Sequence, residues 1–502
     1  MRPRILLGTA LIYLCSANVI WILNDSRPPF WDMAYHQAKA VQVYDAVSSR
    51  GLGGILEISH LTGFYPPLFH CVVAIFFALS GKSIHSGAWA NLPAIAILLF
   101  ATYGLGKRLL APGAAAIGAV LVSFFPLMLW LSREALLDYW LAALVALAML
   151  CLYRTVNFSK RSESFQFGLV CGLGMLTKWT FPIFLVFPAV WTARRNWINA
   201  LLAAVTAAGI SAFWYLSQWR LLDSFFNINQ AGGVAEGDPS KLSFQALVFY
   251  IRALEGYQLF LPLFILFLAG AFLLVRRFTP AWIPIILWIT GGWCGLLLFQ
   301  NKDPRYTVPL LPAVALISAT VFQKKRVWFP ALAGLLLFQH YMVSFGIRQL
   351  PERVVLLQGV QGPLSWDWNL YTQTYFQLWG PPAREDWKIE HVLARTATIG
   401  GPTVKIGIIP SIARFDPEAF EFYGTLRKYN IVIGRLLFFN EAELFNQDYI
   451  LMSEGDQGFA AFSSQDLDRI NRYIMDRSDR FRMIDRFTIP SGQTIRLYQR
   501  TS

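Results

Sequence analysis

The sequence has little charge for its length. Only 15% of its 502 residues are Asp, Glu, Lys or Arg, while 55% are hydrophobic. A soluble globular domain carries about 25% charged residues. Long stretches contain no charge at all, as the hydrocarbon core of a bilayer requires. This composition argues against a soluble protein and predicts a polytopic membrane protein.

Acidic residues are scarce in the first two thirds of the chain. Residues 1–346 contain 25 Lys or Arg and 12 Asp or Glu, whereas residues 347–502 contain 18 of each kind. The net charge of +13 therefore lies in the first part, in short loops between apolar runs. Basic residues in such loops indicate membrane topology, so no nucleic-acid partner is expected.

The chain also lacks cysteine outside its apolar segments and a cleavage site after the first of them. All five cysteines lie in apolar runs, so neither a disulfide framework nor a thiolate metal site is predicted. The run that follows Arg2 and Arg4 has no small-x-small cleavage site directly before Trp21-Ile22-Leu23. This favours an uncleaved first span over a signal peptide.

Apolar runs predict eleven membrane spans, most of them near the ~20 residues needed to cross. They cover residues 5–23, 88–106, 112–131, 135–153, 165–177, 179–191, 198–216, 257–275, 281–299, 307–322 and 328–345. Basic clusters occupy alternate connections, which are cytoplasmic by the positive-inside rule. The alternation requires Pro66–Ser80 to lie in the outer interface and 165–191 to form a hairpin of two short spans. We expect a multi-pass plasma (inner) membrane protein with a cytoplasmic N-terminus.

The last third of the chain is expected to form a soluble α/β domain outside the cell membrane. Alternating and buried apolar patterns predict strands over 405–409, 431–438, 449–452, 481–489 and 494–499, with helices near 417–428 and 464–475. The predicted division is a transmembrane domain, residues 1–346, and an extracytoplasmic α/β domain, residues 347–502. The fold class is therefore a polytopic all-α membrane bundle of about eleven helices, with amphipathic helices in its first outer loop and a C-terminal α/β domain.

The longest outer loop before this domain, residues 24–87, starts with a predicted helix. Pro28 and Pro29 precede the helix and Asp32 lies in its first turn, where a carboxylate is favoured. Helical spacing places Asp32, His36 and Lys39 on one face. The segment should therefore hold a carboxylate just above the lipid headgroups, unless Asp32 serves only as a helix-start charge.

Other ionisable side chains gather at the outer ends of apolar spans. Arg133 and Glu134 precede Asp138, which lies about one turn deeper, where an unpaired charge is costly. Lys178 lies at the tip of the short hairpin, and a compact charged turn contains Asp303-Pro304-Arg305-Tyr306. The alternatives are that Lys178 and Arg305 are cations at helix ends whose heads reach the interface, and that Tyr306 anchors an aromatic belt.

Five segments carry a resemblance to a known family. They are Asp32 after the first span, Tyr65-Pro66-Pro67-Leu68-Phe69-His70, Arg133 with Asp138, Gly172-Leu173-Gly174-Met175-Leu176-Thr177-Lys178, and Arg305-Tyr306 followed by Leu310-Leu311-Pro312. Their order and spacing over residues 1–320 resemble the GT-C membrane glycosyltransferases, in particular the protein O-mannosyltransferases and the lipid A aminoarabinose transferase.

The resemblance implies a hexosyl or pentosyl transferase that uses a polyprenyl-phosphate sugar and inverts the anomeric carbon. It implies that Asp32 is the general base and that Asp138 orients the acceptor or the base. Arg305, Lys178, Arg133 and Tyr306 would bind the donor phosphate, and His36, Tyr65 and Glu134 would contact acceptor or donor. Partners would be the donor lipid, membrane lipids and an acceptor that is a lipid, a glycan or a protein.

Metal binding is not a firm expectation. Four of the six histidines lie in the first outer loop, but their spacings match no ligand pattern. Many relatives carry Asp-Glu where this chain has Asp32-Met33, which removes a second carboxylate. We expect that no cofactor is required and leave a divalent metal open.

Three other functions remain as alternatives. A transporter or flippase for a lipid-linked glycan would place charges near the bilayer midplane and often shows repeated halves; here the charges collect at one face. A membrane-anchored sensor would need far fewer spans. A ligase that transfers a whole glycan chain would differ from a single-sugar transferase in the donor that it accepts.

Overall fold

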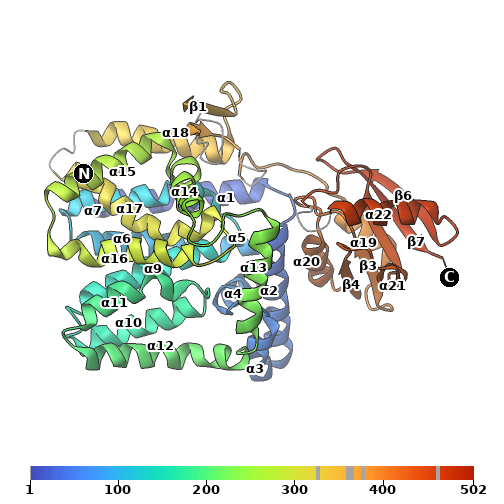
Figure 1. The fold of residues 1–502 in the computed structure, drawn as a ribbon, viewed down its shortest axis with the longest axis horizontal. Helices are drawn as coiled ribbons and strands as arrows, with labels where there is room; N and C mark the ends of the chain where they lie inside the picture. The colour runs from blue at the N-terminus through green and yellow to red at the C-terminus, as the bar shows by residue number, and fades with distance from the viewer. Residues whose placement is uncertain (1, 324–327, 358–366, 375–378, 460–463, 502) are drawn as a thin grey trace. The chain divides into compact units, whose positions relative to one another are not determined.

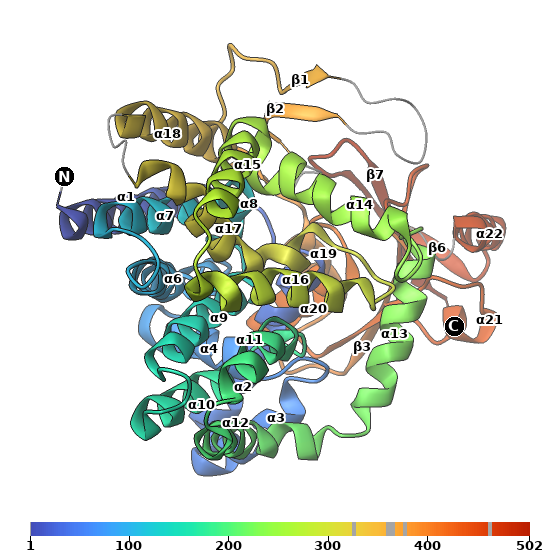
Figure 2. The same ribbon diagram turned by 60° about the vertical axis from the view of Figure 1, so that its left-hand side comes forward.

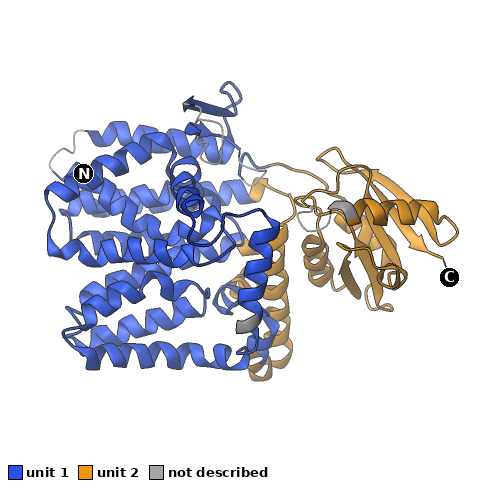
Figure 3. Cartoon of the chain, in the orientation of Figure 1, with its two compact units in different colours: residues 1–22, 57–72, 88–382 blue, residues 23–56, 73–87, 383–502 orange. Residues whose placement is uncertain are grey.

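The computed structural model describes residues 2–323, 328–357, 367–374, 379–459 and 464–501. Contacts divide the chain into two compact units, coloured separately in Figure 3. The first, called the membrane unit, contains residues 1–22, 57–72 and 88–382. The second, called the outer unit, contains residues 23–56, 73–87 and 383–502.

The membrane unit is almost entirely helical (Figure 1). Its elements are α1 (Pro3–Asn24), α6 (Leu92–Gly106), α7 (Pro112–Ser123), α8 (Pro126–Leu131), α9 (Leu137–Arg154), α10 (Arg161–Met175), η1 (Phe181–Phe184), α11 (Val186–Ala193), α12 (Trp197–Ser217), α13 (Leu221–Ala235), α14 (Phe244–Ala253), η2 (Leu254–Leu259), α15 (Phe260–Arg276), η3 (Pro280–Trp282), α16 (Ile283–Leu297), η4 (Pro304–Leu310), α17 (Leu311–Ser318), η5 (Ala319–Phe322), α18 (Phe329–Phe345), β1 (Arg353–Leu357) and β2 (Trp368–Thr372).

Each of the eleven predicted spans is helical. Seven helical segments among the described residues are long and apolar enough to cross a membrane, and four shorter apolar helices accompany them. The apolar run predicted to lie in the interface is the short helix α4 (Leu68–Ser80). The chain is therefore a multi-pass membrane protein, while the sidedness of its loops stays a prediction.

The predicted short hairpin consists of α10 followed by η1 and α11. Its first arm, α10, packs between α9 and α12. Gly168 and Gly172 allow this packing, since a Cβ atom on Gly168 would lie 2.5 Å from the carbonyl oxygen of Ala203 and one on Gly172 would lie 2.7 Å from Ile210. Small residues at such contacts are what lets membrane helices approach closely.

Several elements of the membrane unit did not stand out in the sequence. They are the amphipathic helix α13, helix α14, the wide turn η2 between α14 and α15, and the strand pair β1–β2. Figure 2 shows α14 leading into α15, which lies beside α17.

The outer unit contains a five-stranded sheet of order β4-β3-β5-β7-β6. The strands are β3 (Val404–Ile408), β4 (Ile431–Arg435), β5 (Tyr449–Ser453), β6 (Phe481–Thr488) and β7 (Thr494–Arg500). The helices are α19 (Ile389–Thr396), α20 (Pro417–Arg427), α21 (Glu441–Phe445) and α22 (Ser464–Asp476). These elements confirm the predicted C-terminal α/β domain, although β4 ends three residues before the predicted boundary.

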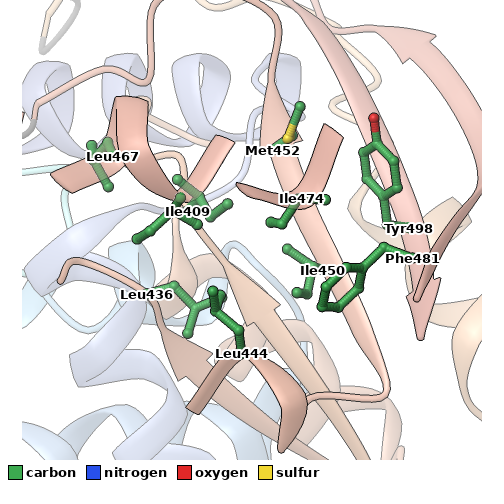
Figure 4. Packing of buried hydrophobic residues seen from close by; sticks show 10 residues of the cluster. Ile409, Leu436, Leu444, Ile450, Met452, Leu467, Ile474, Phe481 and Tyr498 are labelled. Carbon is green, nitrogen blue, oxygen red and sulfur yellow. The ribbon is translucent and has the colours of Figure 1, made fainter. Parts of the chain in front are cut away.

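The core of this sheet is apolar. Its buried members come from strands, helices and loops and are shown in Figure 4: Ile409, Leu436, Leu444, Ile450, Met452, Leu467, Ile470, Ile474, Phe481 and Tyr498. Ile450 and Met452 are alternate residues of β5 and both belong to this core, while Tyr498 is its member from β7.

The outer unit also includes part of the first outer loop. Helix α2 (Trp31–Arg50) begins where Pro28 and Pro29 predict a start and packs along α20. Conversely, the antiparallel pair β1–β2 belongs to the membrane unit. The membrane unit thus ends at residue 382, and the last segment of the outer unit begins at residue 383. The predicted domain boundary between residues 346 and 347 stays a prediction.

Candidate active site

Three ionisable side chains from separate parts of the membrane unit meet at one point. The Lys178 ammonium donates to Oδ1 of Asp138 at 2.7 Å. Nη1 of Arg305 lies 4.0 Å from Oδ2 of the same carboxylate. The Asp138 side chain is only 3% exposed, so this carboxylate is desolvated and paired by two cations. The sequence predicted all three residues as site residues but not their contacts.

Asp138 is placed by helix α9. It lies in the first turn of this helix, where unpaired backbone N–H groups and the helix dipole favour a negative charge. The extended residue before the helix, Leu136, directs the chain into the bundle. The start of the helix is therefore a favourable place for this carboxylate, in addition to its two cationic neighbours.

Lys178 is placed by a tight turn at the tip of the hairpin. The turn follows α10, and the N–H of Lys178 donates to the carbonyl of Gly174 at 3.3 Å. A Cβ atom on Gly174 would lie 2.0 Å from the ring of Phe181, so only glycine lets η1 close on this turn. The Gly-Leu-Gly-Met-Leu-Thr-Lys motif is thus a packing motif that ends in a cation.

Arg305 is oriented by Asp303. The side chain of Asp303 caps η4 by accepting from the N–H of Arg305 at 2.7 Å, with Pro304 as the first helical residue. Nε and Nη2 of Arg305 both donate to Oδ2 of Asp303, at 2.9 and 2.7 Å. Burial alone would raise the pKa of Asp303, but the charge and hydrogen bonds of Arg305, with the charge of Lys178, hold that pKa below its ordinary value.

Asp303 is a site residue that the sequence analysis missed. The signal was present, since Asp followed by Pro at a helix start predicts a cap. What could not be inferred was that the same carboxylate also holds the guanidinium of Arg305.

The chain before Arg305 is anchored to the region of α13. Oδ1 of Asn229 accepts from the backbone N–H groups of Gln300 and Asn301 at 3.2 and 3.4 Å. Oδ2 of Asp238 accepts from the N–H of Lys302 at 2.7 Å. A Cβ atom on Gly233 would lie 2.5 Å from the backbone nitrogen of Asn301, so backbone packs on backbone here. The Arg305 turn is therefore a fixed platform.

Tyr306 lies beside the two cations. Its hydroxyl donates to Oδ1 of Asn301 at 2.5 Å, and the Lys178 ammonium lies 5.1 Å from the centre of its ring. A cation over an aromatic face is favourable. The ring thus helps to hold Lys178, which gives Tyr306 a structural reason to accompany the site.

Arg133, Glu134 and Tyr65 have other surroundings. The guanidinium of Arg133 is buried and donates to Oγ of Ser344 at 2.7 Å and to the carbonyl of Val343 at 3.2 Å. The backbone carbonyl of Glu134 accepts from the side chain of Asn91. Tyr65 is half-buried and packs edge-on against its neighbour Phe64. Their predicted contacts with donor or acceptor stay predictions.

Asp32 and His36 belong to the outer unit. Asp32 lies in the first turn of α2, as predicted, and His36 is buried one turn later. The start of this helix is fixed by the C-terminal domain, because Oδ1 of Asp416 accepts from the N–H of Trp31 at 3.2 Å. Asp416 also caps α20, so one carboxylate joins the starts of two helices.

No group of three or more His, Cys, Asp or Glu side chains is arranged to hold a metal ion within the described ranges. Asp32 is followed by Met33, which offers no hard oxygen ligand. The sequence therefore lacks a second carboxylate directly beside Asp32.

An apolar cavity of about 200 Å³ adjoins the Arg305 turn. Its lining includes Thr307 and Leu310 of η4, the same short helix that contains Arg305. Tyr250, Gln258 and Trp293 also line it. Because Arg305 belongs to the same helix as Thr307 and Leu310, a cation and an apolar space lie in one region, which suits a ligand with an anionic head and a hydrocarbon chain.

The fold is a bundle of apolar helices with a sheet-containing C-terminal domain, and its charged site lies at helix ends. Residues 65–218 match the family model described as dolichyl-phosphate-mannose-protein mannosyltransferase. No curated protein matches the chain significantly.

Among solved structures the chain is similar to ArnT from Cupriavidus metallidurans bound to undecaprenyl phosphate. The TM-score is 0.61 and the identity is 14%, over 98% of both chains. It is also similar to the oligosaccharyltransferase AglB from Archaeoglobus fulgidus in complex with an inhibitory peptide and a dolichol-phosphate. Here the TM-score is 0.56 and the identity is 12%, over 90% of this chain and 69% of that one. These likenesses confirm the predicted resemblance and the fold class.

Proposed function

We propose that the chain is a glycosyltransferase that moves a sugar from a polyprenyl-phosphate carrier to a lipid, glycan or protein acceptor at the outer face of the membrane. The observation that carries the proposal is the meeting of Asp138, Lys178 and Arg305 beside an apolar cavity. The relatives named above support the choice of ligand, since their structures contain undecaprenyl phosphate or dolichol-phosphate.

The cations suit the leaving group of such a reaction. The acceptor oxygen attacks the anomeric carbon, the bond from that carbon to the phosphate oxygen breaks, and polyprenyl phosphate leaves with the electron pair. Negative charge then grows on the phosphate, where Arg donates in a fork and Lys acts as a point charge. We assign these roles to Arg305 and Lys178, with Asp138 and Asp303 holding them in place.

The proton of the acceptor needs a base. Asp32 is the proposed base, as the resemblance implies, and an attack opposite the leaving phosphate would invert the anomeric centre. The rigid start of α2 supports this role, because a general base must be held in place to act. No cofactor is needed for this displacement.

The function can be tested on the purified full chain in nanodiscs. Polyprenyl-phosphate sugars are added together with a membrane extract that contains lipid, glycan and protein acceptors. Mass spectrometry follows transfer of the sugar to an acceptor and the appearance of sugar-free polyprenyl phosphate. The proposal predicts release by the wild type, no release by Arg305→Ala, and near-normal release by a control in an exposed ion pair of the outer unit, Arg427→Ala. In proteoliposomes, passage of the intact lipid-linked sugar across the bilayer without release would instead identify a flippase.

A further inference from the structure

An irregular segment joins α14 to α15 in the membrane unit. Residues Leu254–Leu259 form one wide π-helical turn, and Phe260 follows with φ 59° and ψ 162°. This conformation is essentially restricted to glycine, and for a bulky residue it is strained. Wide turns of this kind are rare within helices and occur frequently at functional sites. The surrounding structure must therefore hold the segment in a geometry that the chain does not prefer.

The segment directs Gln258 at the Arg305 turn. The Gln258 side chain is fully buried, and its Nε2 donates to the carbonyl of Pro304 at 2.6 Å and to Oγ1 of Thr307 at 2.7 Å. These acceptors lie immediately before Arg305 and two residues after it. One amide thus clamps both sides of the residue that we assign to the phosphate.

The other side of the wide turn is also tied down. Oε1 of Glu255, which is fully buried, accepts from the backbone N–H of Asn369 at 2.9 Å. Asn369 belongs to β2. The segment is therefore fixed at both ends, and Gln258 projects from a rigid base.

Gln258 also lines the apolar cavity. Within the part of the chain that the structure describes, its Oε1 has no hydrogen-bond partner, and the same holds for Oη of Tyr250 on the same wall. The volume, about 200 Å³, is smaller than that of a typical whole-ligand pocket, roughly 300–1,000 Å³. It fits a section of a hydrocarbon chain better than an entire ligand.

We propose that Gln258 is a positioning residue that couples filling of this cavity by the isoprenoid chain of the carrier to the placement of Arg305. The inference rests on the proposed function. A chain in the cavity packs against η2, η4 and the Gln258 side chain together, so the amide stays in the position that holds Pro304 and Thr307. Filling the cavity restricts rotation of the Gln258 side chain further and thereby reduces the residual motion of the Arg305 turn.

The first test is a double-mutant cycle on undecaprenyl phosphate binding to the full chain in nanodiscs. Gln258→Met keeps the size of the side chain but removes its donors. We expect Arg305→Ala to weaken binding about tenfold or more in the wild type, but only about two- to threefold in the Gln258→Met background, because Arg305 is already displaced there. Gln339→Met changes a buried glutamine of α18 in the same unit and should leave the full effect of Arg305→Ala.

The second test separates the chain from the phosphate. Undecaprenol has the same hydrocarbon chain and no phosphate, so any effect on Arg305 must pass through the cavity. We expect undecaprenol to slow hydrogen exchange of residues 300–307 in the wild type and in Thr307→Ser, but not in Gln258→Met or Thr307→Val. The Thr307 variants also cover the case in which Gln258→Met fails to fold.

Equal effects of Arg305→Ala in the wild-type and Gln258→Met backgrounds would overturn the coupling. Unchanged exchange of residues 300–307 with undecaprenol in the wild type would overturn it as well. In both cases the proposed function stands if undecaprenyl phosphate still binds through Arg305. Absence of any binding of undecaprenyl phosphate would remove the proposed function itself.

Discussion

The pair formed by Lys178 and Asp138 offers the sharpest test of the site. Lys178→Met leaves the Asp138 carboxylate, whose side chain is 3% exposed, without its 2.7 Å partner. Removing one partner of a buried ion pair costs about 3–5 kcal/mol. We expect the lower end, about 3 kcal/mol of unfolding free energy, because Arg305 remains 4.0 Å from the carboxylate.

Removing both charges should reverse most of this loss. Replacing a buried ion pair by apolar side chains of similar volume is often neutral or stabilising. The double variant Asp138→Leu/Lys178→Met should therefore unfold within about 1 kcal/mol of the wild type. It should nevertheless fail to bind undecaprenyl phosphate, because the point charge for the phosphate is gone.

The assay is reversible unfolding of the purified chain in mixed micelles of increasing SDS content, with binding of undecaprenyl phosphate measured on the same samples. The two single variants are Lys178→Met and Asp138→Leu. If the unfolding free energy lost in the double variant equals the sum of the losses in these two, the reasoning about a desolvated pair is refuted. A double variant that is stable and binds undecaprenyl phosphate normally would refute the assignment of Lys178 to the phosphate.

Four further predictions concern other residues. Gly174→Ala should displace Phe181, which lies 2.0 Å from the added Cβ, and reduce both thermal stability and sugar transfer; unchanged values would contradict the packing. Asp32→Asn should lower the transfer rate by about 10²–10⁴-fold at unchanged membrane expression. Asp416→Ala should destabilise the outer unit by about 1 kcal/mol, because the cap of α20 is lost. It should also slow transfer, because the start of α2 that carries Asp32 loses its hydrogen bond to Asp416. A loss of stability with unchanged transfer would contradict a role of Asp416 in positioning α2. Hydrogen bonds from Arg486 and Arg496 lower the pKa of Glu454 to about 2. The contribution of Glu454 to stability is therefore present above pH 4.5 and is lost as the pH falls toward 2. Protection of β7 against hydrogen exchange should fall over this range in the wild type and not in Glu454→Gln.

Most of the fold could be predicted from hydropathy and from the residues typical of turns. The eleven apolar runs are helical, and strands β3 and β5–β7 begin and end within one or two residues of their predicted bounds, because period-two patterns and flanking turn residues are local signals. The wide turn η2 was missed although Glu255, Gly256 and Gln258 interrupt the apolar pattern there, because no local pattern specifies a π-helical turn and tertiary contacts hold it.

Most residues of the candidate site could be predicted from the sequence, but their contacts could not. The residue types and depths of Asp138, Lys178 and Arg305 marked them individually. Their meeting depends on how three segments of the bundle pack, and the role of Asp303 depends on the direction of the Arg305 side chain. No local pattern contains either fact, because both arise from tertiary packing.

A structure of the chain with undecaprenyl phosphate bound tests the central claim most directly. The account predicts phosphate oxygens within about 3 Å of the Lys178 ammonium and the Arg305 guanidinium, with the first isoprene units in the cavity lined by Gln258. The account would be contradicted if the phosphate bound elsewhere and the positions of Asp138, Lys178 and Arg305 did not change on binding.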